Sequence, residues 1–140
     1  MITVTGGSGF LGSHVVERLR ARGHRVFAPT HSLYDLRDPK HVEVMFDAVR
    51  PDKVIHLAAT CGGIGANQKK PGTFFYDNIL MGVNLMEAAR LKGVSKFVQV
   101  GTVCSYPKHC PVPFKEEGVV SPAERLESVG YGVLKSEKTT

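Results

Sequence analysis

The chain has 140 residues, of which 42% are hydrophobic and 22% charged, which is typical of one folded soluble domain and leaves little room for a second. Its net charge of +5 suits an anionic small molecule such as a nucleotide. The basic residues are dispersed, so a nucleic-acid partner is not expected, and the apolar runs are short, so a membrane partner is not expected. Three cysteines without regular spacing argue against a disulfide framework, and the N-terminus does not match a secretory signal, so a cytoplasmic location is expected.

Short apolar runs rich in β-branched residues alternate along the chain with segments that repeat apolar residues at helical spacing. The runs at residues 2–5, 25–28, 53–59 and 96–100 predict four strands. Helices are expected from Phe10 to near Gly23, from Pro39 to near Pro51, from near Pro71 to about Leu91, and in a last segment after Ser121. Between the third strand and the third helix, residues 61–67 predict a glycine-rich loop.

This alternation predicts an α/β fold, a Rossmann-like doubly wound parallel sheet with helices on both faces. A complete sheet of this type has about six strands. The sequence therefore predicts a sheet truncated after the helix that contains Tyr131 and Lys135. Ligands bind such sheets beyond the carboxyl ends of the strands, and the unusual residues of this sequence follow its predicted strands.

The first of these positions is the turn Thr5-Gly6-Gly7-Ser8-Gly9-Phe10-Leu11-Gly12, which joins a predicted strand to a predicted helix. Its glycines fit the pattern G-x-G-x-x-G, in which glycine permits the tight turn, the approach of a pyrophosphate and the packing of helix against strand. The N-terminus of the helix adds free N–H groups and a partial positive charge. The sequence therefore predicts a dinucleotide site that contains Gly6, Gly7, Ser8, Gly9, Phe10, Leu11 and Gly12.

The end of the second predicted strand bears on the choice between NAD and NADP. An acidic residue there would hold the ribose 2′-hydroxyl of NAD, but the sequence reads Ala28-Pro29-Thr30-His31 and has no carboxylate. It has no arginine for a 2′-phosphate either. The candidate contacts are His31, Thr30 and Ser8, and NADP(H) is favoured over NAD(H).

Two groups later in the chain are candidates for catalysis. Tyr131 and Lys135 are four residues apart, which places both side chains on one face of the predicted helix. The Lys135 ammonium group would lower the pKa of Tyr131 and so suit the pair to acid–base chemistry. The alternative interpretation is a packed tyrosine beside a surface lysine without a catalytic role. After the fourth strand, Thr102 can donate a hydrogen bond to a carbonyl, and Cys104 is either a proton shuttle or an inert buried thiol. Cysteine and histidine spacing does not fit zinc, so no metal is expected, and His56 is interpreted as a hydrogen-bonded core residue.

The glycine turn, the strand end 56–59, the Thr102 segment and the Tyr131/Lys135 pair together resemble the extended short-chain dehydrogenase/reductase family. Within that family, three segments are similar to the GDP-L-fucose synthase group: residues 62–67, 75–78 and 104–108. The resemblance covers essentially the whole chain, but only the N-terminal part of that family's enzymes. Two departures are Gly130, where the family often has proline, and the lack of basic residues after the second strand.

The resemblance implies roles for the candidate residues. Gly6 to Gly12 would bind the cofactor pyrophosphate, and Asp35 and Leu36 would contact the adenine. Further cofactor contacts are implied for His31, Leu57, Ala58, Ala59, Val100, Gly101, Thr102 and Lys135. Catalytic roles are implied for Thr102, Cys104, Tyr131 and Lys135. Tyr131 would protonate the C4 oxygen of the sugar, and Cys104 would act in epimerisation with a histidine that lies beyond Thr140.

Residues 1–140 are thus expected to be an incomplete NAD(P)-binding Rossmann domain, the N-terminal part of an NADP-dependent enzyme that acts on a nucleotide-sugar. By resemblance, that enzyme converts GDP-4-keto-6-deoxymannose to GDP-L-fucose by epimerisation at C3 and C5 and hydride reduction at C4. The chain alone is expected to be inactive, and an exposed sheet edge would allow a homodimer. Two alternatives stay open: another NAD(P)-dependent nucleotide-sugar epimerase or dehydratase, and a non-catalytic nucleotide-binding module.

Overall fold

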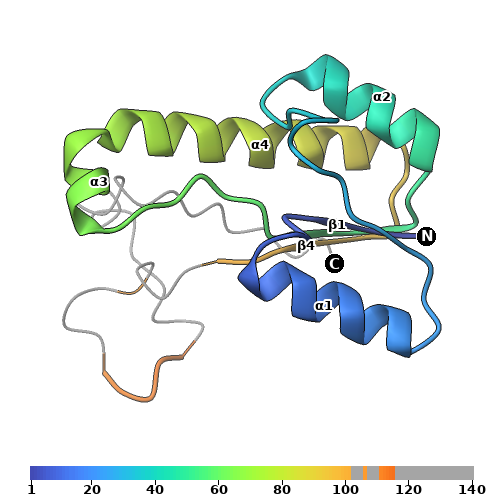
Figure 1. Cartoon of the computed structure of the whole chain (residues 1–140), viewed down its shortest axis with the longest axis horizontal. Helices are drawn as coiled ribbons and strands as arrows, with labels where there is room; N and C mark the ends of the chain where they lie inside the picture. The colour runs from blue at the N-terminus through green and yellow to red at the C-terminus, as the bar shows by residue number, and fades with distance from the viewer. Residues whose placement is uncertain (102–105, 107–110, 116–140) are drawn as a thin grey trace.

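The computed structural model describes residues 1–101, 106 and 111–115, apart from the side chains of Ile64 and Asn67. In chain order the elements are β1 (Ile2–Thr5), α1 (Phe10–Ala21), β2 (Val26–Phe27), α2 (Pro39–Val49), β3 (Lys53–His56), α3 (Ile64–Lys69), α4 (Pro71–Leu91) and β4 (Lys96–Gln99) (Figure 1). The helix predicted after Ser121 lies outside the described residues. Among those residues, no helix combines the length and the apolar character that a membrane crossing needs.

The four strands form one parallel sheet in the order β2-β1-β3-β4. Ile2 of β1 lies beside Val26 of β2 on one side and beside Lys53 of β3 on the other. After β2 the chain returns past β1 to form β3, so the carboxyl ends of β1 and β3 flank the point where the winding reverses. This topology confirms the predicted Rossmann-like sheet, and ligands bind doubly wound sheets at that point.

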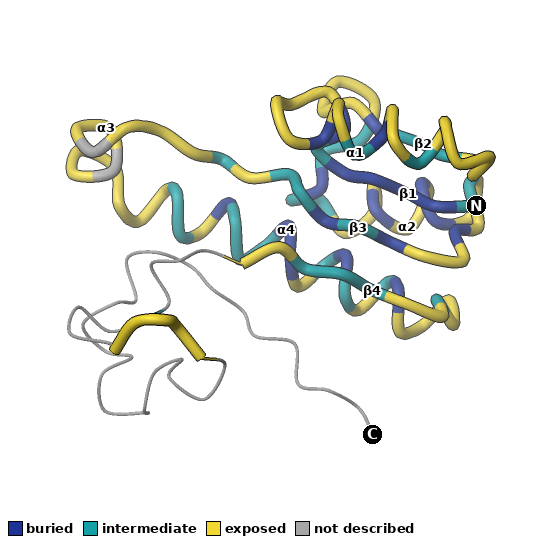
Figure 2. The backbone as a smooth tube through the Cα atoms, turned by 90° about the horizontal axis from the view of Figure 1, so that it is seen from below, coloured by how far each residue is buried: buried dark blue, intermediate teal, exposed yellow. Residues whose placement is uncertain are grey.

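Helices cover both faces of the sheet, with α1 on one face and α2 and α4 on the other (Figure 1). The larger apolar cluster lies between the sheet and the α2–α4 pair and contains Leu36, Val42, Met45, Phe46, Val54, Met81, Leu85 and Ala89. The cluster beneath α1 is smaller, with Ile2, Val4 and Val16 buried. Figure 2 shows buried residues along β1 and β3, whereas α3 and the first turns of α4 are largely exposed and extend beyond the carboxyl ends of the strands.

Local sequence signals set most of the helix ends. Asp38 accepts a hydrogen bond from a backbone N–H of the first turn of α2 at 2.8 Å, and Pro39 follows it, so α2 begins where the sequence predicts. Gly23 and Gly93 follow α1 and α4 with φ angles of 79° and 68°, which glycine adopts without steric cost. In contrast, the residue that caps the C-terminus of α2 is Arg50, whose φ of 47° is left-handed.

The expectation of a loop at residues 61–67 is wrong, because this run contains most of the short helix α3. Six residues are too few to show helical periodicity in the sequence, and Gly65 lowers the helix propensity further. A single residue, Lys70, separates α3 from α4, and its N–H donates to the Ala66 carbonyl at 3.0 Å. Three strands are also shorter than predicted, since β2 has only two residues, β3 ends at His56 and β4 ends at Gln99.

Candidate functional site

The turn between β1 and α1 is built on glycines that leave no room for a side chain. Gly6 has a φ of 70°, and a Cβ there would lie 2.6 Å from the amide nitrogen of Ala58. A Cβ on Gly12 would lie 2.0 Å from the Gly6 carbonyl oxygen, and a Cβ on Gly7 would lie 2.7 Å from the Ala28 Cβ. These three glycines therefore permit the close packing of the turn against α1, the end of β2 and the segment after β3.

Gly9 differs from the other glycines of the turn. Its backbone is extended, with a φ of −78°, and a Cβ there would meet only the Gly6 carbonyl oxygen, at 3.3 Å. Packing within the described residues therefore does not require glycine at this position. A ligand that approached the backbone closely from outside would require it, and the fingerprint gives this role to one of its glycines. Ser8, beside it, is exposed.

The N-terminus of α1 opens at this turn without a side-chain cap. The Ser13 N–H donates to the Gly9 carbonyl at 2.9 Å, so the N–H groups of Phe10, Leu11 and Gly12 have no partner within the helix. The first turn contains no acidic residue, and Phe10 and Leu11 are exposed. Since the helix dipole places about half a positive charge here, the arrangement suits an anion such as a phosphate group.

The segment after β3 forms the opposite side of the turn. Leu57 donates its N–H to the last carbonyl of β1 at 3.1 Å, which continues the pairing of the two strands. Leu57 and Ala58 are half-buried and Ala59 is exposed. Asn78 of α4 holds the next residue through its backbone: the Asn78 Oδ1 accepts from the Thr60 N–H at 2.8 Å, and the Nδ2 donates to the Thr60 carbonyl at 2.9 Å. Thus α4 sets the path of this segment.

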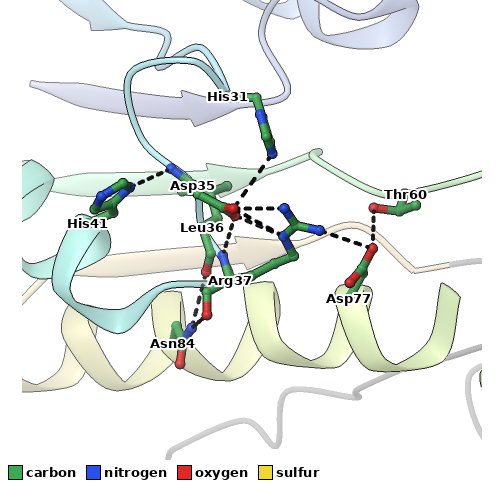
Figure 3. A network of polar contacts seen from close by, with 8 residues as sticks. All are labelled: His31, Asp35, Leu36, Arg37, His41, Thr60, Asp77 and Asn84. Atoms are coloured by element: carbon green, nitrogen blue, oxygen red, sulfur yellow. Dashed lines mark hydrogen bonds and ion pairs between the residues drawn. The ribbon is translucent and has the colours of Figure 1, made fainter. Parts of the chain in front are cut away.

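The segment after β2 carries Asp35 and Leu36, for which contact with adenine is implied. Leu36 is 6% exposed and belongs to the larger apolar cluster, so its side chain points into the core. Nδ2 of Asn84 in α4 donates to the carbonyls of Leu36 and Arg37 at 3.1 and 3.0 Å. The Asp35 and Arg37 side chains lie together (Figure 3), and His31 is exposed with its Nε2 3.8 Å from Asp35 Oδ2.

Arg37 bridges two carboxylates from different parts of the chain (Figure 3). Its Nε and Nη2 donate to Asp35 at 2.9 and 2.7 Å, and its Nη1 donates to Asp77 Oδ2 at 3.4 Å. The hydrogen bonds from Arg37 hold the pKa of Asp35 well below its usual range, and the bonds to Asp35 raise the pKa of Arg37. Asp77 is buried and also accepts from Thr60 Oγ1 at 3.5 Å. The network joins the segments after β2 and β3 to α4.

Arg37 is not among the site residues that the sequence predicts, and Asp77 and Asn78 enter there only through the family resemblance of residues 75–78. Arg37 and Asp77 are 40 positions apart, so no local pattern announces their contact. A weak signal for the other half of the network does exist. Asp35 and Arg37 lie on either side of one apolar residue, a spacing at which two opposite charges can meet next to a buried side chain.

His56 links the carboxyl ends of the two strands that flank the reversal of winding. Its Nδ1 lies 2.6 Å from Thr5 Oγ1, and the residue is 2% exposed. Burial lowers the pKa of His56 to about 4, so the ring is neutral at pH 7. The interpretation of His56 as a hydrogen-bonded core residue is confirmed.

The remaining candidate residues follow β4 or lie further along the chain. Val100 and Gly101 are exposed at the same edge of the sheet as the glycine turn. Four candidate residues lie outside the described part of the chain: Thr102, Cys104, Tyr131 and Lys135. Within the described part, no group of three or more His, Cys, Asp or Glu side chains could hold a metal ion.

Comparison with known proteins gives matches along almost the whole chain. The model of the NAD dependent epimerase/dehydratase family matches residues 2–136. Over 134 residues, 96% of this chain, the sequence is 29% identical to a GDP-L-colitose synthase of Yersinia pseudotuberculosis and 31% identical to a GDP-L-fucose synthase of Sinorhizobium fredii. The chain spans only 44% and 43% of the length of these relatives. A GDP-L-fucose synthetase from Naegleria fowleri, bound to NADP, matches with a TM-score of 0.74 and 31% identity over 84% of this chain and 36% of that one.

Proposed function

Because the chain belongs to the NAD dependent epimerase/dehydratase family, we propose that it is the dinucleotide-binding part of a nucleotide-sugar epimerase/reductase. Residues 1–140 would form an NAD(P)-binding Rossmann domain that lacks the substrate-binding part, since the chain spans less than half the length of its relatives. The proposed parent reaction converts GDP-4-keto-6-deoxymannose to GDP-L-fucose. The similarity to a GDP-L-fucose synthase supports this choice of substrate.

The N-terminus of α1 is the observation that carries the proposal. Glycine at position 9 is not required by packing, the first N–H groups of the helix have no partner within it, and its first turn has no acidic residue. These features fit the pyrophosphate of a dinucleotide. NADP(H) is proposed in preference to NAD(H), with Ser8, Thr30 and His31 as contacts of the 2′-phosphate. The Asp35 carboxylate, four residues after His31, is paired with Arg37.

The proposed chemistry divides among four residues that follow β4. The cofactor, when bound, would supply the hydride for C4. The Tyr131 hydroxyl would give its proton to the C4 oxygen, and the Lys135 ammonium group would hold the ribose and lower the pKa of Tyr131. Thr102 would donate a hydrogen bond to the same oxygen. The ketone at C4 acidifies the protons at C3 and C5, and Cys104 would move these protons during epimerisation.

A second candidate is an epimerase/reductase for a different GDP-4-keto sugar. The similarity to a GDP-L-colitose synthase supports it, at nearly the same identity and coverage as the first. The residues around the glycine turn would serve both reactions equally, because the turn meets the cofactor rather than the sugar. Turnover of a panel of GDP-4-keto sugars by the full-length parent enzyme distinguishes the two reactions.

Calorimetric titration of the 140-residue chain with NADPH and NADH tests the cofactor site. We expect NADPH to bind more tightly than NADH, and Gly9→Val to weaken NADPH binding at least about 100-fold, because the valine methyls occupy the path of the pyrophosphate. The matched control is Gly72→Val, where a Cβ would meet nothing within 4 Å, and its NADPH affinity is expected to be unchanged. Absence of binding by the wild-type chain contradicts the proposal, and tight binding by Gly9→Val contradicts the assignment of the turn.

A further inference from the structure

Basic side chains gather at the amino edge of the sheet, where the four described strands begin. They are dispersed in the sequence, but in a parallel sheet each connecting helix ends where the next strand begins. The C-terminal ends of α1, α2 and α4 therefore lie at this edge as well, on the side of the chain's N-terminus (Figure 1). The exposed lysines and arginines at these strand starts and helix ends are Arg22, Arg25, Arg50, Lys53, Lys92 and Lys96.

Three of these residues form a row along the strand starts, the Arg25–Lys53–Lys96 row. Lys53 and Lys96 are paired residues of β3 and β4, and Arg25 directly precedes β2. Since β1 lies between β2 and β3 and neighbouring strands are about 4.8 Å apart, the row is roughly 14 Å long. Lys53 and Lys96 leave the sheet on the same face, because residues in register point the same way. Two like charges at this spacing repel each other and lower stability.

No ion pair compensates the row within the described part of the chain. Arg25, Lys53 and Lys96 have no acidic partner there, whereas Lys92 is paired with Asp47. The helix dipole favours a cation after the last turn of a helix, which accounts for the basic residues that follow α1, α2 and α4. A sheet has only a small net dipole, so no such effect accounts for the row. An anionic partner would relieve the repulsion that folding leaves there.

Two exposed carboxylates bear on which anionic partner fits this edge. The Asp52 side chain, paired with the Met1 ammonium group, is 73% exposed, and that of Asp47 is 58% exposed. The phosphates of a nucleic acid or a lipid offer these carboxylates only acceptors, whereas a peptide offers backbone N–H donors together with acidic side chains. The basic residues of this edge are not interleaved with aromatic rings on which bases could stack. Leu91 is the large apolar side chain exposed at the described helix ends, which is too little for insertion into a membrane.

We propose that the amino edge of the sheet binds an acidic, extended segment of a partner protein, centred on the Arg25–Lys53–Lys96 row. The row matches the length of about four residues of extended chain. It lies at the opposite edge of the sheet from the glycine turn, so the partner leaves the candidate dinucleotide site open. The inference does not rest on the proposed function.

Fluorescence anisotropy of a labelled poly-glutamate peptide, titrated with the full 140-residue chain, tests the inference. We expect binding that weakens as the salt concentration rises from about 50 to 300 mM, because the charges are exposed and are screened. Arg25→Gln/Lys53→Gln/Lys96→Gln is expected to weaken binding roughly tenfold, the combined effect of three exposed ion pairs.

The matched control is Lys40→Gln/Lys69→Gln/Lys70→Gln. It lowers the net charge by the same amount, but its exposed lysines lie where α2 and α4 begin, at the other edge of the sheet. Its affinity for the peptide is expected to fall less than about threefold. Thermal unfolding establishes that each variant folds, and the row variant should unfold at or above the wild-type temperature because it loses a like-charge pair. Where that variant does not unfold cooperatively, Lys96→Gln replaces it, with an expected loss of about two- to threefold against none for Lys40→Gln.

The outcomes decide both the place and the partner. Equal losses in the two triple variants overturn the inference, because net charge alone would then account for binding. A wild-type chain that does not bind the peptide overturns it as well. Tighter binding of an oligouridylate of equal charge, or of phosphatidylglycerol vesicles, overturns the choice of a protein partner. A chain that binds the peptide at the row but does not bind NADPH supports the inference and contradicts the proposed function, so the two fail separately.

Discussion

At the scale of single residues, the glycines after β1 divide into three that internal packing requires and one that it does not. Gly6, Gly7 and Gly12 are required by contacts within the protein, whereas a Cβ on Gly9 would have one neighbour, at 3.3 Å. The sequence pattern treats these glycines alike and predicts the turn correctly. The pattern does not tell which of these glycines the packing requires, because that depends on which atoms lie next to each one once β2 and β3 have paired with β1.

We expect Gly12→Ala to cost more than about 3 kcal/mol of unfolding free energy, because the added Cβ overlaps the Gly6 carbonyl and either the turn or α1 must shift. Gly9→Ala is expected to cost less than about 1 kcal/mol, since the same carbonyl has to move only slightly. Urea denaturation of the two variants measures both values. Equal costs would contradict the separation of roles.

His56 makes the stability of the chain depend on pH. Burial lowers its pKa to about 4, from an ordinary value of 6.5. Below pH 6.5 the unfolded chain therefore takes up a proton that the folded chain does not, and stability falls as the pH falls toward 4. Between pH 7.5 and 5.5, urea denaturation should show a loss of about 1 kcal/mol from this group.

The control for this pH dependence is His56→Gln, which keeps a hydrogen-bonding side chain beside Thr5 but does not titrate. Asp35 does not affect this comparison. Its pKa is lowered in the folded chain, so its contribution to stability is lost only below pH 3.8, the ordinary pKa of an aspartate. We expect the variant to lose the difference between the two pH values. A variant that retains the whole difference would show that another group is responsible.

The candidate site could be predicted from the sequence only where its residues are close together in the chain. The glycine turn is one continuous segment, and the role of His56 follows from its place in an apolar strand. Arg37 and its buried partner Asp77 are 40 positions apart in the sequence, so the ion pair between them is visible only in the folded chain. The roles assigned to Thr102, Cys104, Tyr131 and Lys135 stay predictions, because these residues lie outside the described structure.

At the scale of secondary-structure elements, α2 shows which helix ends the sequence can predict. Asp38 and Pro39 are strong local signals, and the structure begins the helix there. The other end has no glycine, and Arg50 takes the left-handed conformation itself, with a φ of 47° and a ψ of 64°. The prediction failed at α3 because six residues are too few to show a helical period, and Gly65 lowers the helix propensity further.

Arg50→Gly is expected to stabilise the chain by up to about 1 kcal/mol, because a left-handed conformation costs a non-glycine residue about 1–2 kcal/mol, and the greater freedom of glycine in the unfolded chain offsets part of that gain. Circular dichroism should show a rise of about 2–4 °C in the unfolding midpoint. Arg90→Gly, inside the last turn of α4, is the matched control and should lower stability by about 1 kcal/mol. A lowered midpoint for Arg50→Gly would contradict the argument.

At the scale of the whole molecule, the described residues divide unequally between the two faces of the sheet. Among them, the face toward α2 and α4 buries eight residues in one cluster, and the face toward α1 buries three. The alternation of strands and helices predicts the parallel sheet, since a right-handed crossover joins each pair of strands. It does not predict this imbalance, which depends on how many helices come to lie on each face.

We expect the larger cluster to dominate stability. Phe46→Ala should cost about 3–5 kcal/mol of unfolding free energy, because the side chain is 1% exposed at the centre of that cluster. Val16→Ala, in the smaller cluster, removes two methyl groups and should cost about 2 kcal/mol. Urea denaturation compares the two, and a larger cost for the α1 side would reverse the assignment of the main core.

In the part of the chain that the structure describes, the side-chain amides of Asn78 and Asn84 in α4 hydrogen-bond to backbone groups of the segments after β3 and β2. Asn78 holds the N–H and carbonyl of Thr60, and Asn84 holds the carbonyls of Leu36 and Arg37. Because these hydrogen bonds go to backbone groups, they do not depend on the side chains of the two segments, such as those of the exposed His31 and Ala59. Over evolutionary time, the surface that meets a ligand can therefore exchange its side chains while its frame keeps its shape, and ligand preference can drift within one unchanged fold.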